Sequence, residues 1–353
     1  GTDLTPTDAV TVEATSTSEI DSIAATAVLA VGAGSGPGVA ISLAGSVSLG
    51  KITNTVEALV RSTSNVYTGS GHDMVVRATD ASSISGDAGS GSLAVGAGSG
   101  PGVAVSGAGS IGINEIANVV RASISDSFVE IGGDLLVEAI SESEVSVVAV
   151  AISGAVGAGS AGIGVSGAGA VALNEIANTV EASLINADID PTGPLSAVTV
   201  NAEDRSTITA DGGGVALSVG AGSTGVGVAV GGTVADNRIG AVDIDDVDTD
   251  NLQVSGIDDP DTPQDEGAPV PLGPLEHSVR ALVINTTIGA SGARANAVEV
   301  TASSTARIDV LAVAGAAGVG AGSVGVGAAL AGVFSTNRSR GIVEAAVVNS
   351  EVW

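Results

Sequence analysis

Three features of the sequence predict an all-β repeat protein. A glycine-rich string recurs along the chain, apolar residues alternate with a period of two, and Gly accounts for 52 of 353 residues while aromatic residues make up 1%. Dense Gly and β-branched residues disfavour helix, because each Gly inside a helix costs about 1 kcal/mol relative to Ala. Strict alternation is instead the pattern of β-strands.

The repeat length follows from two landmarks that keep the same register. Both recur about every 62 residues, with one longer interval before the last copy, which predicts about five repeats stacked on one another. The string Val-Gly-Ala-Gly-Ser begins at Val31, Val95, Val156, Val219 and Val319. The second landmark is a Val in a shared strand pattern, at Val56, Val120, Val180, Val242 and Val343.

These landmarks predict the organisation of the chain. Residues 1–249 form a β-repeat array, with units at about 10–80, 81–142, 143–204 and 205–249. Residues 250–289 form an acidic, Pro-rich insertion, and residues 290–353 form a fifth repeat that continues the array.

Two architectures fit this repeat. A β-solenoid (parallel β-helix), which we favour, would place three coils of about 20 residues in each unit. Stacked long antiparallel hairpins are the alternative, with Ala-Gly-Ser-Gly-Pro-Gly as the turn between two strands of about eleven residues. In both architectures Gly supplies positive φ at the turn, and Pro37 and Pro101 fix φ there.

The two faces of each strand differ in size. In the third repeat one face carries large apolar residues such as Val148 and Ile152, and the other carries Gly, Ala and Ser, as at Ala149 and Ser153. A strand with one face in water would place charged or long polar residues on that face. We therefore expect both faces to be covered, with the small residues allowing another sheet to approach closely.

The glycine strings also match G-x-G-x-x-G, starting at Gly157, Gly220 and Gly320. A dinucleotide site needs a helix to open directly after this motif, so that the helix N-terminus binds the pyrophosphate. Strand-like sequence follows each copy instead, and no Lys-Ser/Thr pair completes a P-loop. We interpret the motif as a structural turn.

Catalytic residues are scarce. The two histidines, His72 and His277, lie in loop-like sequence without a repeated partner. The charged position after each uncharged run changes sign between repeats, which indicates a solvated turn and no catalytic role. That position is occupied by Lys51, Glu115, Glu175, Asn237 and Arg338. We therefore predict that the chain is not an enzyme.

Asn recurs at a third position, as Asn54, Asn118 and Asn178. In a solenoid turn its amide can bond the backbone of the next coil. Gly240 and Gly341 take this position in the last two units, which suits a tight turn better than a ligand site.

The insertion carries the clearest hint of a binding site. Ten carboxylates lie between Asp243 and Glu266, with no Lys or Arg among them. Ca²⁺ takes six to eight oxygen ligands, so clustered Asp residues can bind it, although the spacing is not that of an EF-hand. The candidate ligands are Asp243, Asp245, Asp248, Asp250, Asp258 and Asp259. A solvated acidic loop, kept extended by Pro, is the alternative interpretation.

Charge and composition limit the partners. A net charge of −28 disfavours nucleic acid and anionic membrane surfaces. The uncharged runs at 22–50 and 145–174 are broken by Gly and Ser and lack aromatic or basic anchors, so we do not expect them to span a membrane. The chain has no Cys, and its N-terminus has neither a signal peptide nor an initiator Met. We expect a mature product or a piece of a longer chain.

The alternating Ala/Gly/Val strands, the junction "NEIANTVEAS" (174–183) and the strand "GGDLLVEA" (132–139) resemble giant repetitive bacterial surface proteins. The resemblance is to filamentous-haemagglutinin-like and leukotoxin-type filamentous adhesins, and it covers residues 10–250 and 298–353. It implies an elongated, exported scaffold at the cell surface. No catalytic or receptor-binding motif of those proteins is present to be carried over.

Three functions follow as hypotheses. The first is an extracellular structural protein of a fibre, sheath or surface layer, whose partners are copies of itself. The second is an adhesin segment that binds a ligand or Ca²⁺ through the insertion. The third, more remote, is a polysaccharide-acting β-helix enzyme, which the scarcity of aromatic residues disfavours.

Overall fold

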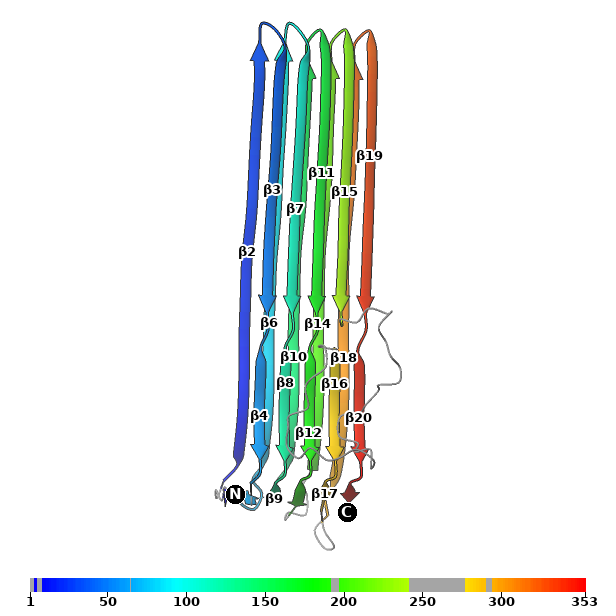
Figure 1. Ribbon diagram of the computed structural model, residues 1–353. Helices are drawn as coiled ribbons and strands as arrows, with labels where there is room; N and C mark the ends of the chain where they lie inside the picture. Colours follow the sequence, from blue (N-terminus) through cyan, green and yellow to red (C-terminus); the bar gives the residue numbers. More distant parts are fainter. Residues whose placement is uncertain (1–2, 5–7, 64, 192–196, 241–276, 290–293) are drawn as a thin grey trace, which may run out of the picture.

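In the computed structural model the chain is a β-solenoid of five coils, each passing once through four parallel sheets (Figure 1). The structure describes residues 3–4, 8–63, 65–191, 197–240, 277–289 and 294–353, and within them it contains strands and no helix. The predicted fold class is confirmed. The alternative of antiparallel hairpins is wrong, because the strand pairings of the described residues are parallel.

Each coil rises through one long strand and returns through two shorter ones. The strands that rise form the long sheet: β2 (Val10–Gly34), β6 (Met74–Gly98), β10 (Leu135–Ala158), β14 (Ala197–Ala221) and β18 (Ala297–Ala321). The strands that return from the upper tip form the middle sheet: β3 (Gly38–Ile52), β7 (Gly102–Ile116), β11 (Ala161–Ile176), β15 (Thr224–Ile239) and β19 (Val324–Ser339).

Below a bend the return path continues in the short sheet, and a closing sheet completes the coil near the chain termini (Figure 1). The short sheet contains β4 (Thr55–Arg61), β8 (Val119–Ser125), β12 (Thr179–Ile185), β16 (Ser278–Ile284) and β20 (Ile342–Val348). The closing sheet contains β1 (Asp3–Leu4), β5 (Asn65–Tyr67), β9 (Phe128–Ile131), β13 (Asp188–Pro191), β17 (Thr287–Ile288) and β21 (Glu351–Val352).

One repeat is therefore one coil, and the expectation of three coils of about 20 residues is wrong. The reason lies in β2 and its equivalents, in which alternation runs through 25 residues without a turn. The rising strand reverses at the tip, where β2 ends at Gly34 and β3 begins at Gly38, so that Pro37 lies in the turn as expected.

Most glycines at the tip are needed because the facing strand lies too close for a Cβ atom, and not because the backbone adopts a positive φ. Of the tip glycines only Gly322 has a positive φ, 151°. A Cβ at Gly157 would overlap the carbonyl oxygen of Ile163 on the facing strand, and a Cβ at Gly96 would overlap that of Val103. Glycine thus lets the long and middle sheets lie against each other at the upper end of the coil.

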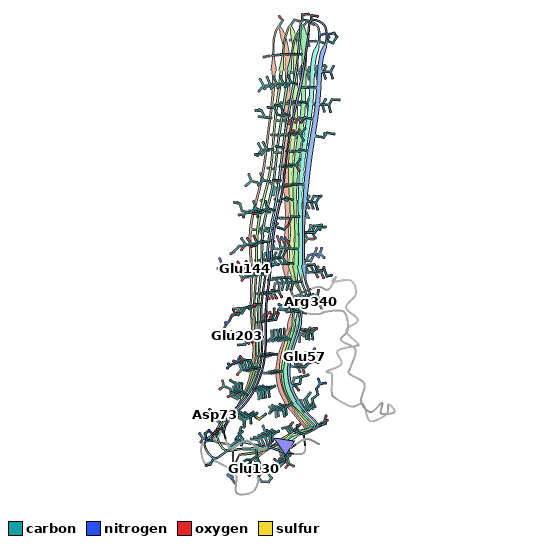
Figure 2. All side chains as sticks on the ribbon, turned by 90° about the vertical axis from the view of Figure 1, so that its left-hand side faces the viewer. Glu57, Asp73, Glu130, Glu144, Glu203 and Arg340 are labelled. Atoms are coloured by element: carbon teal, nitrogen blue, oxygen red, sulfur yellow. The ribbon has the colours of Figure 1, made fainter. Side chains whose placement is uncertain are left out.

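The lower half has a conventional core. Large apolar residues of the long and short sheets fill it, including Leu135, Val180 and Leu184, each at most 1% exposed. A row of Ile and Val closes this core where the sheets converge: Ile52, Ile84, Ile116, Val145, Ile176, Ile208 and Ile239. Figure 2 shows the two layers wide apart in this half and close together above it.

The upper half, which we call the uncharged blade, is packed in the opposite way. It comprises residues 22–50, 88–114, 145–174, 212–235 and 310–337, none of which is charged. Its interior is Ala, Gly and Ser, as in the cluster of Ala40, Ala94, Ala104 and Ala155. Buried hydroxyls bond one another across the sheets, for example Ser92 with Ser42 and Ser106, both at 2.8 Å.

The large apolar residues of the blade lie outside. Ile152 is 56% exposed and Val148 39%, whereas Ala149 and Ser153 are at most 1% exposed. The expectation that the small face is covered is confirmed, and the expectation that the large face is covered too is wrong for this chain. Small side chains allow two sheets to meet closely, which turns the larger side chains of the same strands outward.

Candidate functional site

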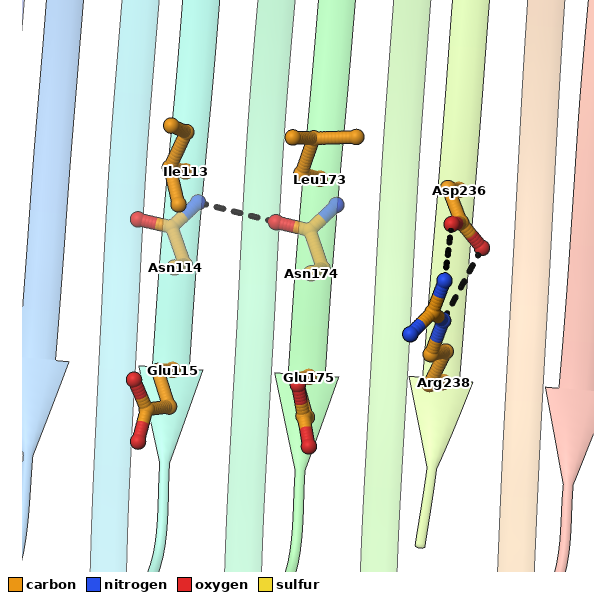
Figure 3. Close-up of a pocket in the computed structure, with 8 residues that line it drawn as sticks. All are labelled: Ile113, Asn114, Glu115, Leu173, Asn174, Glu175, Asp236 and Arg238. Atoms are coloured by element: carbon orange, nitrogen blue, oxygen red, sulfur yellow. Dashed lines mark hydrogen bonds and ion pairs between the residues drawn. The ribbon is translucent and has the colours of Figure 1, made fainter. Parts of the chain in front are cut away.

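A shallow pocket lies on the middle sheet, at the lower ends of β7, β11 and β15 (Figure 3). Its volume is about 240 Å³. The side chains that line it come from one stretch of three neighbouring strands, in register with one another. They are Ile113, Asn114, Glu115, Leu173, Asn174, Glu175, Asp236 and Arg238.

An asparagine ladder forms one wall of this pocket. Asn114 donates from Nδ2 to Oδ1 of Asn174 at 2.9 Å, and Asn174 donates to Asn237 at 2.7 Å. The ladder continues from Asn237 to Asn337 at 3.0 Å. Asn174 and Asn237 are thereby each both donor and acceptor, and the ladder helps to fix the register between coils.

A row of charged residues forms the outer rim. Lys51 bonds Glu115 at 2.9 Å, and Arg238 bonds Asp236 of its own strand at 2.6 Å. The predicted charged position is corrected at one member: Arg238 is in register with Glu175, while Asn237 points inward into the ladder. These residues lie in strands and not in a turn. Opposite charges are neighbours at Lys51–Glu115 and Glu175–Arg238, and like charges are neighbours at Glu115–Glu175 and Arg238–Arg338.

Glu175 is the perturbed group of this rim. Its pKa is raised above the ordinary value of 4.5, first because partial burial penalises the carboxylate and second because Glu115 lies beside it. Asp236 adds to the rise, whereas Arg238 and Lys51 oppose it. The pocket therefore offers one carboxyl that holds its proton more readily than an exposed Glu, but its lining contains no Ser, Cys, His or Lys that could act as a nucleophile.

The predicted Asn position lies at the bend between the middle and short sheets. The amide oxygen of Asn118 accepts from the backbone N–H of Asn54 at 2.9 Å, and that of Asn178 accepts from Asn118 at 3.1 Å. This is the expected bond to the next coil. In the fourth coil the position belongs to His277, whose Nδ1 accepts from the Asn178 N–H at 3.4 Å, so the assignment to Gly240 is corrected.

Two buried carboxylates lie beneath this bend, and sequence reasoning missed both. Asp80 accepts from Nδ2 of Asn118 at 2.7 Å, and Asp204 lies 3.3 Å from Nε2 of His277. Both carboxylates have 0% exposure. The alternation of inward and outward residues could have revealed them. Asp80 falls in the inward series, between Ala78 and a buried Ser, where a charged side chain needs hydrogen-bond donors around it.

The two histidines have different carboxylate partners. His277 is buried against Asp204, and exposed His72 lies 3.9 Å from a carboxylate oxygen of Asp8. The side chains of His277 and Asp204 are 2% and 0% exposed, so this pair lies inside the coil.

The predicted Ca²⁺ ligands Asp243, Asp245, Asp248, Asp250, Asp258 and Asp259 lie outside the described residues. Elsewhere in the described chain no three His, Asp or Glu side chains are grouped as metal ligands. The expected landmark Val242 lies outside the described residues as well, and Val279 of β16 occupies the register position of Val180.

The insertion enters and leaves the coil at adjacent register positions. Ile239 pairs with Ile176, and Ser278 pairs with Thr179, so Gly240 and His277 stand where the third coil has the consecutive residues Ala177 and Asn178. β16 and β17 fall within the predicted segment 250–289 and close the fourth coil.

The G-x-G-x-x-G motifs starting at Gly157, Gly220 and Gly320 all lie at the tip turns, and each is followed by a strand of the middle sheet. A helix N-terminus for a pyrophosphate is therefore missing from these described segments. The described residues also contain no helix with the length and apolarity needed to cross a membrane.

No family model, curated protein or solved structure matches this chain.

Proposed function

We propose that the chain is an extracellular structural protein that builds a fibre, sheath or surface layer by stacking its coils end to end. The observation that carries the proposal is the in-register parallel pairing of successive coils, which continues through the long, middle and short sheets from the first coil to the last. The inward face of β20 is open where the inward faces of β8, β12 and β16 are sealed by the next coil.

The exposed fractions of residues at the same register position in successive coils show how open this face is. Val120, Val180 and Val279 are each 0% exposed, whereas Val343 at the same register position is 50% exposed. Val283 is 0% exposed and its ladder neighbour Val347 is 51% exposed. Repeat proteins need a cap over such a surface or a further repeat that covers it.

The first coil offers the complementary edge. β2, β3 and β4 lie at the ends of their sheets, so one side of each strand carries backbone groups without a ladder partner among the described strands. Such edges pair readily with parallel strands of another chain. Stacking the first coil of one copy on the last coil of another would cover Val343 and Val347 and continue three sheets at once.

The test is a charge placed on the open end. The double variant Val343→Lys/Val347→Lys buries two ammonium groups in the proposed contact, which is unfavourable without partners. We expect the unmodified chain to form filaments or sheets by negative-stain electron microscopy at about 0.5 M NaCl, where its net charge is screened, and the variant to stay dispersed.

Glu344→Lys is the matched control, because Glu344 lies on the opposite face of the same strand, in a row whose inner members Arg280 and Glu181 are charged and only partly buried. It should assemble like the unmodified chain. Dispersed particles of the unmodified chain, or equal assembly of the double variant, would reject end-to-end stacking through this surface.

A second function, ligand or Ca²⁺ binding by an adhesin segment, is favoured by the way the insertion joins the coil. Because Gly240 and His277 stand at adjacent register positions, residues 241–276 can be deleted with the coil left intact. Isothermal titration with Ca²⁺ compares the deletion with the full chain. Binding by the full chain alone supports this function, and equal heats or none would reject it for Ca²⁺.

A further inference from the structure

The outer face of the middle sheet carries an apolar patch that crosses all five strands. Its most exposed side chains include Leu43 (69%), Leu49 (67%), Leu330 (67%), Ile41 (64%) and Phe334 (63%). These residues come from the first and last coils, and residues in register with them on β7, β11 and β15 continue the patch between them. The patch is thus a property of the whole sheet.

Six outward rows make up this patch, which we call the blade face. The rows begin on β3 at Val39, Ile41, Leu43, Gly45, Val47 and Leu49 and continue in register across the sheet. Asp236 is the one charged residue in these rows, and it is bonded to Arg238. The next row down is the charged rim that begins at Lys51.

The area of the blade face exceeds what a solitary soluble surface carries. Five strands about 4.8 Å apart and twelve residues at about 3.3 Å each span roughly 24 by 40 Å. The resulting patch of roughly 900 Å² compares with about 300–600 Å² for the largest apolar patch of a typical monomer. It matches the roughly 800 Å² that each partner contributes to a stable protein interface.

Two apolar surfaces could cover the blade face: a lipid membrane or a second copy of the chain. A hydrocarbon surface would leave the backbone groups at the edges of β3 and β19 without hydrogen bonds, which is costly in lipid. The same face of another copy is apolar, equal in size and rigid. We propose that the blade face packs against the blade face of a second copy, side by side with the end-to-end stacking proposed above.

A two-fold axis that runs along the rows, between the Leu43 row and the Gly45 row, gives the best fit. The strands of the two copies are then antiparallel, with β3 facing β3, and Leu43 of each copy faces Gly45 of the other. Such a contact is isologous, as in most homodimers. The charged rim falls beside the tip of the other copy and stays in water.

Shape supports this arrangement. The Gly45 row is glycine on every strand: Gly45, Gly109, Gly169, Gly232 and Gly332. A Cβ at these positions would meet nothing closer than 3.9 Å, so the chain's own packing does not require glycine there. In the proposed dimer this row receives Leu43, Val230 and Leu330 on β3, β15 and β19, whereas on β7 and β11 it faces Gly107 and Gly167. The large Phe334 faces the small Ala328.

The experiment uses the Val343→Lys/Val347→Lys chain, in which end-to-end stacking is blocked, so that failure of either proposal is seen separately. Analytical ultracentrifugation should detect a dimer. Adding Val165→Glu places a charge at the centre of the blade face and should raise the dimer dissociation constant at least 10-fold. Leu217→Glu, on the outer face of the long sheet, is the control and should leave the dimer unchanged.

Cross-linking tests the axis. The chain has no Cys, so Leu43→Cys and Gly45→Cys can be mixed and treated with a short bis-maleimide. The mixture should cross-link more than either variant alone.

Monomers at all concentrations, or a dimer broken by Leu217→Glu and not by Val165→Glu, would overturn the proposal. Binding of the chain to phosphatidylcholine vesicles that Val165→Glu abolishes would identify lipid as the occupant and overturn it as well.

Discussion

The two halves of this solenoid share the strands of the long sheet but pack them in opposite ways. Below the isoleucine row the long and short sheets enclose large side chains such as Leu184, and charged residues such as Glu57 and Glu203 face outward (Figure 2). Above the row, in the uncharged blade, the interior is Ala, Gly and Ser, and Leu43 and Ile152 face outward.

A protein core usually combines burial of apolar area with close packing of the backbone, and in this chain the two are divided between the halves. The lower half gains stability from apolar area removed from water, at about 25 cal/mol per Å². The blade interior buries little area per residue and depends on close contact and on ordered hydroxyl and backbone hydrogen bonds. Its large side chains contribute to stability only when something outside covers them, which is why we assign the side-by-side contact between copies to the blade face.

The largest contrast is expected between two identical substitutions. Leu184→Ala removes a side chain with 0% exposure from the lower core and should lower the free energy of unfolding by about 3 kcal/mol. Leu43→Ala, at 69% exposure on the blade, should change it by less than about 0.5 kcal/mol. Urea denaturation of dilute protein measures both, and equal losses would contradict the inverted packing of the blade.

Two glycines give a smaller contrast within the blade. Gly157→Ala forces a methyl group against the Ile163 carbonyl and should cost about 2 kcal/mol, because backbone atoms cannot move aside. Gly169→Ala meets no atom within 4 Å and should stabilise the chain by about 0.5 kcal/mol through reduced strand entropy. Thermal unfolding by circular dichroism compares them. A destabilised Gly169→Ala monomer would show that the glycine row is needed inside the coil.

The smallest effect concerns pH. Because the pKa of Glu175 is raised in the folded chain, this group favours folding at low pH, and that contribution is lost as pH rises above 4.5 and through the folded pKa. Glu175→Gln should therefore match the unmodified chain near pH 3.5 and be more stable at pH 7, by a few tenths of a kcal/mol, since solvent screens the half-exposed carboxyl.

The difference in midpoint temperature between Glu175→Gln and the unmodified chain, measured across that pH range, checks the sign. Glu115→Gln, which removes the neighbouring carboxylate, should reduce the same difference. A difference that grows toward acid would refute the assigned pKa direction.

Repetition and alternation were sufficient to predict a stacked all-β repeat, because five copies of one string must occupy equivalent places, but they favoured the solenoid over antiparallel hairpins without deciding between them. The size of a coil could also have been predicted, because no turn interrupts the alternation between Val10 and Gly34. We instead expected the usual coil length of about 20 residues. The fourth landmark was misplaced at Val242 because local similarity near Arg238 hides the fact that the strand resumes only at Ser278.

Which face is inside could not be read from alternation, since the pattern has the same period either way. The rule that large apolar residues are buried holds for Val180 and fails for Ile152. For the site, the Asn bond at the bend followed from residue chemistry, whereas the Asp204–His277 pair depends on a register set across the insertion.

The most direct test of the inverted blade is the accessibility of two adjacent residues of β14. Leu217 is 50% exposed and Ser218 is 0% exposed, and the chain has no Cys of its own. Under native conditions Leu217→Cys should react with maleimide nearly as fast as in urea, and Ser218→Cys should be strongly protected. Protection of Leu217→Cys with rapid labelling of Ser218→Cys would contradict the account.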